Sequence, residues 1–197
     1  MNVALIAPYA TAQTVLKADK AALQPQISRD SIGFDRCGIR AAVSPFDPQG
    51  KRAEAYDFAI MFNATTRYAM IKGGKTSASY DPVTKKFGNL NVTVLAPSNF
   101  WLAEELDGKP VIMEKLSASP TKGFVIGFGE SAPSVKAVRA MMDGRRVQFV
   151  MRYKSEKIDK VISFAAKLPP EELALLEKCF ADLSERMSAE SPAAKKQ

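Results

Sequence analysis

The clearest pattern in the chain is the strict alternation of apolar and polar positions in AYDFAIMFN. A period of two places successive side chains on opposite faces, so this stretch predicts a β-strand with one buried face. The residues on that face are Tyr56, Phe58, Ile60 and Phe62. Residues 63–65 then turn the chain into a second predicted strand, TRYAMIK.

Turn signals recur about every eight to twelve residues from Cys37 onward, which is typical of a β-rich domain. Shorter strands are predicted in NVTVL, PVIMEKL and GFVIGF, and RRVQFVMRYK and KIDKVISF predict a hairpin. The sequence therefore predicts an α+β fold that is mainly β, an antiparallel β-sandwich of about seven to nine strands.

Helical spacing of apolar residues appears at two places late in the chain. SAPSVKAVRAMMDG predicts a short helix over about 134–143, because Pro133 suits a first turn and Gly144 ends it. PPEELALLEKCFADLSERM predicts an amphipathic helix over about 170–187 that packs on a sheet, with Cys179 at the margin of its apolar stripe. The stripe consists of Leu173, Leu176, Phe180, Leu183 and Met187.

The 197 residues are about one domain long. Residues 32–187 are predicted to form a single β-rich domain. Residues 13–31 are rich in Ala and Gln, and we interpret them as a short helix or a loose lead-in segment. The tail, residues 188–197, is predicted to be disordered.

The first twelve residues, MNVALIAPYATA, match the second half of a secretory signal. Residues 3–10 are mostly apolar, and residues 10–12 have the small-x-small pattern that signal peptidase reads. The charged first part of a signal is missing, because no Lys or Arg precedes Lys17. We interpret residues 1–12 as the remnant of a signal, with a mature chain that begins near Gln13. The alternative is an N-terminal strand that docks on the domain.

Two residue counts restrict the chemistry. The chain has no histidine, which excludes a Ser-His-Asp or Cys-His relay and the usual histidine-containing zinc site. Its two cysteines, Cys37 and Cys179, are what a single structural disulfide needs, and such a bond persists in an oxidising compartment. The alternative is two unpaired buried thiols that act as small hydrophobes. We predict no cofactor, no metal and no transmembrane segment.

Two short motifs are incomplete. KGGKT at 72–76 is similar to the end of a phosphate-binding loop, but Ala69 stands where that motif has a glycine, and both flanks read as strands. We therefore predict a hairpin turn there. Residues 119–122 fit S-x-x-K, but Pro120 and the strand that follows argue against the helix on which that motif depends.

Positive charge is concentrated near the predicted hairpin. Residues 136–167 contain nine Lys or Arg against three Asp or Glu, which accounts for nearly all of the net charge of +7. A positive hairpin over residues 145–160 attracts anionic polymers or lipid head groups, whereas the alternative is a solvated strand that guards a sheet edge. No recognition motif for nucleic acid accompanies the charge. The candidate anion-binding residues are Arg146, Arg152, Lys154 and Lys157.

A group of carboxylates, Glu104, Glu105 and Asp107, follows Trp101. Paired carboxylates beside an aromatic ring are typical of glycoside hydrolysis, so a small carboxylate-based hydrolase is one hypothesis. The alternative is a solvated loop. We name no catalytic residue and do not decide from the sequence whether the protein is an enzyme.

The order GFVIGF, SVKAVRAMMDGRRVQFVMRY, KVISFAAKLPPEELALLEKC resembles the C-terminal half of the invasion-associated locus B proteins, an exported family of alphaproteobacteria. The resemblance covers roughly residues 120–182 and rests on the apolar pattern, with departures at Gly127 and at residues 169–170. It implies a periplasmic or extracellular β-sandwich without known catalysis. The sequence thus favours a non-catalytic binding or accessory protein of the bacterial envelope, with a protein or an anionic envelope component as partner, and a role in host interaction is one possibility. A basic adaptor that acts through residues 145–160 is the main alternative.

Overall fold

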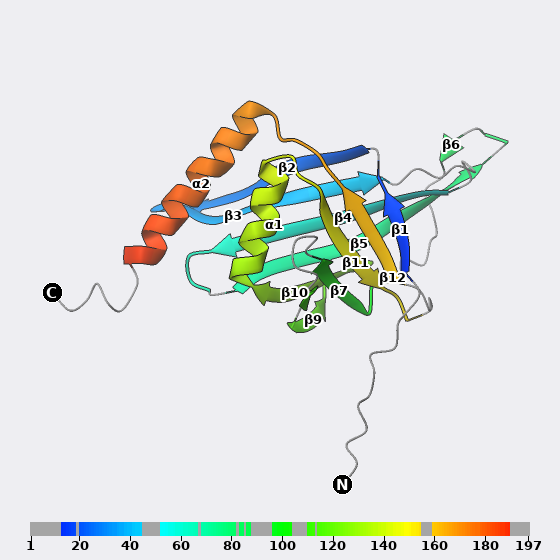
Figure 1. The fold of residues 1–197 in the computed structure, drawn as a ribbon, viewed down its shortest axis with the longest axis horizontal. Coiled ribbons are helices and arrows are strands. Elements are labelled where there is room, and N and C mark those ends of the chain that lie inside the picture. The colour runs from blue at the N-terminus through cyan, green and yellow to red at the C-terminus, as the bar shows by residue number, and fades with distance from the viewer. Residues whose placement is uncertain are drawn as a thin grey trace, which may run out of the picture.

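The computed structural model describes residues 13–18, 20–44, 52–66, 68–81, 83–84, 86–87, 96–103, 110–112, 114–154 and 159–189. Within these ranges the chain forms two β-sheets and two helices (Figure 1). This arrangement confirms the predicted α+β, mainly β, sandwich-like fold. The predicted signal remnant, residues 1–12, lies outside the described residues, as do residues 190–197 of the predicted tail.

The larger sheet has seven strands, and all of its neighbouring strands are antiparallel. Its main path runs, in spatial order, through β2 (Lys20–Asp30), β3 (Gly33–Ser44), β4 (Arg52–Asn63), β5 (Tyr68–Asp81), β10 (Phe124–Glu130) and β9 (Glu114–Ala118). The two-residue strand β6 (Lys86–Phe87) pairs with the far end of β5.

The smaller sheet has five strands. Their order is β1 (Gln13–Lys17), β12 (Asp159–Phe164), β11 (Val147–Arg152), β7 (Asn99–Ala103) and β8 (Pro110–Ile112). The β11–β12 pair confirms the predicted hairpin. The β1–β12 pair is parallel, unlike the all-antiparallel sandwich that the sequence predicted.

The interpretation of residues 13–31 as a helix or a loose lead-in was wrong, because they form β1 and β2 and join both sheets. Strand β2 contains Pro25, and it is an edge strand, where a missing N–H is tolerated. The described residues therefore form twelve strands rather than seven to nine. The predicted strand PVIMEKL is also divided into β8 and β9.

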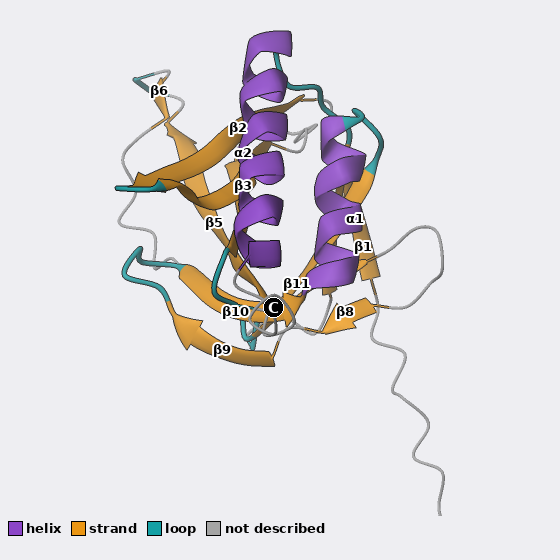
Figure 2. Ribbon diagram, turned by 90° about the vertical axis from the view of Figure 1, so that its left-hand side faces the viewer, coloured by secondary structure: helices purple, strands orange, loops and turns teal. Residues whose placement is uncertain are grey.

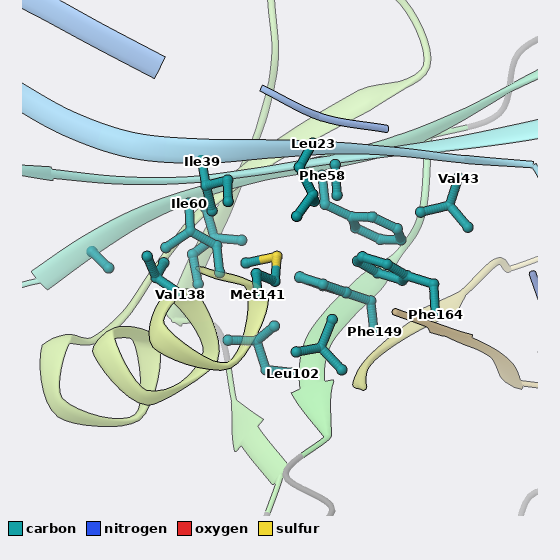
Figure 3. Packing of buried hydrophobic residues seen from close by; sticks show 14 of the residues in the cluster. Leu23, Ile39, Val43, Phe58, Ile60, Leu102, Val138, Met141, Phe149 and Phe164 are labelled. Atoms are coloured by element: carbon teal, nitrogen blue, oxygen red, sulfur yellow. The ribbon is translucent and has the colours of Figure 1, made fainter. Parts of the chain in front are cut away.

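The two sheets pack face to face, and the strands of the smaller sheet run across those of the larger one (Figure 1). The alternation in β4 is confirmed, because Tyr56, Phe58, Ile60 and Phe62 are all buried. Phe58 meets Phe149 and Phe164 from the smaller sheet in the core between the sheets (Figure 3).

The two helices cover the part of the larger sheet's inner face that the smaller sheet leaves open. Helix α1 (Ser131–Met142) contacts β4, β5, β10 and β11, and helix α2 (Pro170–Ala189) contacts β2 and β3. Figure 2 shows the helices side by side, with the larger sheet behind them. Both predicted helices are confirmed. Helix α1 ends at Met142, and Gly144 follows its C-cap residue with a φ of 69°, which favours glycine.

The prediction of a hairpin turn at residues 72–76 was wrong, because these residues lie inside the long strand β5. The glycines serve close packing instead. A Cβ atom on Gly73 would lie 2.8 Å from the ring of Phe100, and one on Gly74 would lie 2.6 Å from the ring of Phe124. Each glycine therefore leaves space for an aromatic ring against the strand.

Candidate binding groove between the two helices

A buried disulfide fixes α2 to the larger sheet. Cys37 on β3 and Cys179 on α2 have Cα atoms 5.8 Å apart and are joined through their sulfurs, and both residues are fully buried. The predicted pairing is confirmed. Cys179 therefore faces the sheet. Its place at the margin of the apolar stripe was compatible with this inward direction.

A second attachment lies near the C-terminal end of α2. Arg186 donates a hydrogen bond from Nη1 to the carbonyl oxygen of Phe34 at 2.7 Å, and its Nη2 lies 3.0 Å from Oδ2 of Asp30. Because Asp30 ends the edge strand β2 and Phe34 belongs to its neighbour β3, this arginine fixes the helix to the first two strands of the larger sheet. The position of α2 is thus determined at two points along its length.

An apolar groove of about 420 Å³ lies between the two helices. Its floor contains Phe62, which meets the ring of Phe180 edge-on at a centroid distance of 5.7 Å. The complete lining consists of Phe62, Asn63 and Thr66 from the larger sheet and its β4–β5 turn, Ser131, Val135, Val138, Arg139 and Met142 from α1, and Glu177, Phe180, Leu183, Ser184 and Met187 from α2. Helix α2 packs on β2 and β3, whereas α1 packs on β4, β5, β10 and β11, and the groove lies between the two helices.

A charged hollow of about 470 Å³ lies next to the groove, at the C-terminal end of α1. The hollow is lined by Arg139, Met142, Asp143, Arg145, Leu173 and Glu177, and it shares Arg139, Met142 and Glu177 with the apolar groove. Asp143 and Arg145 form an ion pair at 3.0 Å. The two linings together show that α1 and α2 run antiparallel. The groove is lined by Ser131 at the start of α1 and by Met187 near the end of α2, whereas the hollow joins the end of α1 to Leu173 near the start of α2.

Arg139 and Glu177 are exposed and border both cavities. Within the part of the chain that the structure describes, no hydrogen bond or ion pair involves either side chain. Their charged ends therefore lie more than 4.0 Å apart. A cation and an anion thus flank the junction of the two cavities without neutralising each other.

The four candidate anion-binding residues are not equivalent. Arg152 donates to both carboxylate oxygens of Asp159, at 2.6 and 2.7 Å, and its guanidinium lies 5.3 Å from the ring centroid of Trp101. Arg146 is exposed and donates to the hydroxyl of Ser163 at 3.3 Å. Lys154 is exposed, and Lys157 lies outside the described residues. The positive charge of Arg152 is therefore balanced by the carboxylate of Asp159. Anion binding by the four candidate residues stays a prediction.

One cation of the basic segment points into the sandwich instead of outward. Lys160 on β12 lies opposite Met151, whose side chain is fully buried, and its Nζ is 3.7 Å from Oε2 of Glu54. Lys75 Nζ approaches the other carboxylate oxygen of Glu54 at 3.5 Å, and the hydroxyl of Tyr56 donates to Glu54 at 2.6 Å. The Glu54 cluster therefore joins the two sheets at the end of the sandwich away from α2 (Figure 1).

The Glu54 cluster predicts acid sensitivity. Burial raises the pKa of Glu54, but the Tyr56 hydroxyl, Lys160 and Lys75 lower it more, so the pKa lies below its ordinary value of 4.5. A pKa that is lower in the folded than in the unfolded state stabilises the fold above the unfolded-state value and loses that contribution as the pH falls. We expect Glu54→Gln to lower the free energy of unfolding by about 2 kcal/mol at neutral pH, with a difference from wild type that shrinks below pH 4.5.

Urea unfolding at a series of pH values measures this difference. Glu177→Gln serves as the control, because the exposed Glu177 carboxylate has no partner among the described residues and should not affect stability at any pH. A deficit in Glu54→Gln that stays constant as the pH falls would show that the carboxylate charge is not the stabilising feature.

The carboxylates Glu104, Glu105 and Asp107 lie outside the described residues, so the hydrolase hypothesis stays a prediction. The sequence reasoning missed the groove altogether. It assigned Phe180, Leu183 and Met187 to a face packed on a sheet. Leu183 is 3% exposed in the core and Phe180 contacts Phe62, as expected, but both also line the groove, and Met187, which lines it too, is 43% exposed. A groove between two helices depends on their relative placement, and neither apolar stripe encodes that placement by itself.

The fold and the groove together define the class: a disulfide-tied β-sandwich with two helices that border an apolar groove. Comparisons of the chain with protein-family models, with curated proteins and with solved structures found no match. Neither helix within the described ranges is long and apolar enough to cross a membrane.

Proposed function

We propose that this protein is a non-catalytic binding protein of the bacterial envelope and that the apolar groove between α1 and α2 is its ligand site. The groove carries the proposal. Its volume of about 420 Å³ lies in the range of small-molecule sites, and most of its lining surface is apolar, with polar groups among the lining residues, as in such sites.

The disulfide supports the proposed location in the bacterial envelope. A buried disulfide persists in the periplasm or outside the cell, whereas cytosolic thiols are kept reduced. The resemblance of residues 120–182 to the invasion-associated locus B family implies the same compartment. Intact mass measured with and without reductant, on protein taken from its native host after thiols are blocked, tests this part. Alkylation of both cysteines before reduction would contradict an oxidising location.

Binding of the apolar fluorophore N-phenyl-1-naphthylamine tests the ligand site. We expect its fluorescence to rise on binding to the wild-type protein, because the groove removes the dye from water. Ser184→Trp places an indole in the groove and should weaken binding by at least about tenfold, since it fills volume that the dye needs.

Ala181→Trp is the matched control. Ala181 is also an exposed α2 residue, but it does not line the groove, so this variant should bind the dye like wild type. Equal binding by wild type and both tryptophan variants, or no binding to the wild type, would contradict the groove as a ligand site.

A further inference from the structure

The apolar groove and the charged hollow are adjacent, because they share three lining residues, and they offer two kinds of surface. Val138 and Leu183, which line the groove, are 2% and 3% exposed, so this part of its lining is apolar and buried. The hollow is lined by two cations, two carboxylates and the apolar residues Met142 and Leu173. A ligand that fills both cavities is therefore an amphiphile, with an apolar tail between the helices and a polar head beside the end of α1.

The volume of the groove limits the tail to one chain. A methylene group occupies roughly the space of a water molecule, about 30 Å³. The groove's volume of about 420 Å³ then holds about fourteen such groups. This matches one acyl chain of ordinary length and leaves no space for a second.

The charges at the junction favour a head with both signs. Arg139 and Glu177 border both cavities and do not pair with each other or with another described residue. A head with only a negative charge would satisfy Arg139 and meet repulsion from Glu177. A zwitterionic head offers its phosphate to the guanidinium and its ammonium to the carboxylate.

We propose that the site binds a lysophospholipid, a lipid with a single acyl chain and a zwitterionic phosphate head such as phosphoethanolamine. This inference rests on the proposed function of the groove as a ligand site. The acyl chain lies between Phe180 and Val135, the phosphate is bound by Arg139, and the ammonium is bound by Glu177.

Displacement of the fluorophore tests the ligand class. The lipids compared are palmitoyl lysophosphatidylethanolamine, palmitoyl lysophosphatidylglycerol, palmitate and monopalmitoylglycerol, each at concentrations at which it forms no micelles. We expect the zwitterionic lipid to bind about tenfold more tightly than the uncharged monopalmitoylglycerol and also more tightly than the two anionic lipids. Equal affinity for all four would overturn the assignment of the head group.

Two charge variants assign the contacts. Arg139→Gln should weaken binding of the zwitterionic and both anionic lipids by about tenfold and leave monopalmitoylglycerol unchanged. Glu177→Gln should weaken only the zwitterionic lipid and strengthen the anionic ones, because it removes a repulsive charge. Lys178→Gln is the matched control, since Lys178 is exposed on α2 but lines neither cavity. An equal effect of all three variants would overturn the proposed contacts.

The result separates this inference from the proposed function. If the fluorophore binds, Ser184→Trp blocks it and none of the four lipids displaces it, the groove is a ligand site and the lysophospholipid is wrong. If the fluorophore does not bind, both are wrong. Arg139 and Glu177 are exposed and have no partner among the described residues, so their variants should fold normally and unfold at the wild-type denaturant midpoint.

Discussion

Loss of the Cys37–Cys179 disulfide is expected to lower the free energy of unfolding by between about 2 and 5 kcal/mol. The bond joins residues separated by 142 positions, so the loop that it closes in the unfolded chain contains most of the protein. Restricting so long a loop removes conformational entropy from the unfolded state, and the stabilisation grows slowly with loop length. An ordinary domain has a total stability of about 5 to 15 kcal/mol, so this loss is a large fraction.

Guanidinium unfolding of the wild type with and without reductant measures the effect. The double variant Cys37→Ala, Cys179→Ala is the control, because reductant should not change its midpoint. The slope of free energy against denaturant should also increase when the bond is absent, since the unfolded chain then exposes more surface. An unchanged midpoint in wild-type protein whose mass shows complete reduction would contradict the expectation.

The Cys37→Ala, Cys179→Ala double variant also tests whether the disulfide is needed for binding in the groove. Helix α2 forms one wall of the groove and is fixed to the larger sheet by the disulfide and by Arg186. Without the disulfide, the contacts that hold the N-terminal half of α2 to the rest of the described chain are apolar ones. We therefore expect the double variant to bind the fluorophore more weakly than the wild type even under conditions where it stays folded.

Local patterns in the sequence predicted the elements that depend on their own residues. The alternation of Tyr56, Phe58, Ile60 and Phe62 required only that one face of a strand be buried, and it was confirmed. The turn after β4 was equally local, because the side chain of Asn63 accepts a hydrogen bond from the N–H of Thr66 at 2.8 Å.

The predictions that were wrong depended on partners far away in the chain. Gly73 and Gly74 read as a turn, yet they lie in a strand that pairs with β4 and β10, and the rings of Phe100 and Phe124 occupy the space beside them. Arg152 is a different case, because its partner Asp159 is only seven positions away across the hairpin, and its role in anion binding stays a prediction. A sequence pattern gives the charge or shape of a residue, whereas its role depends on the neighbour that the fold brings to it.

Phe58→Ala is expected to be the most destabilising single substitution in the core, with a loss of between about 3 and 5 kcal/mol. Phe58 is 1% exposed, and its ring stacks on those of Phe149, Phe100 and Phe164 at centroid distances of 4.0, 5.6 and 6.5 Å. These three rings belong to the smaller sheet, so this ring from the larger sheet fills the space between the two layers (Figure 3). Its removal leaves a cavity and also eliminates three aromatic contacts.

Phe128→Ala is the matched control for Phe58→Ala, measured by thermal unfolding and by guanidinium unfolding. Phe128 is also a phenylalanine of the larger sheet, but it is 39% exposed, so its truncation should cost less than about 1 kcal/mol. Phe58→Leu should fall between the two, because leucine keeps much of the buried apolar volume but cannot stack. If Phe58→Ala and Phe128→Ala lost the same stability, the packing of the two sheets on each other would not be the main contribution to the stability of this domain.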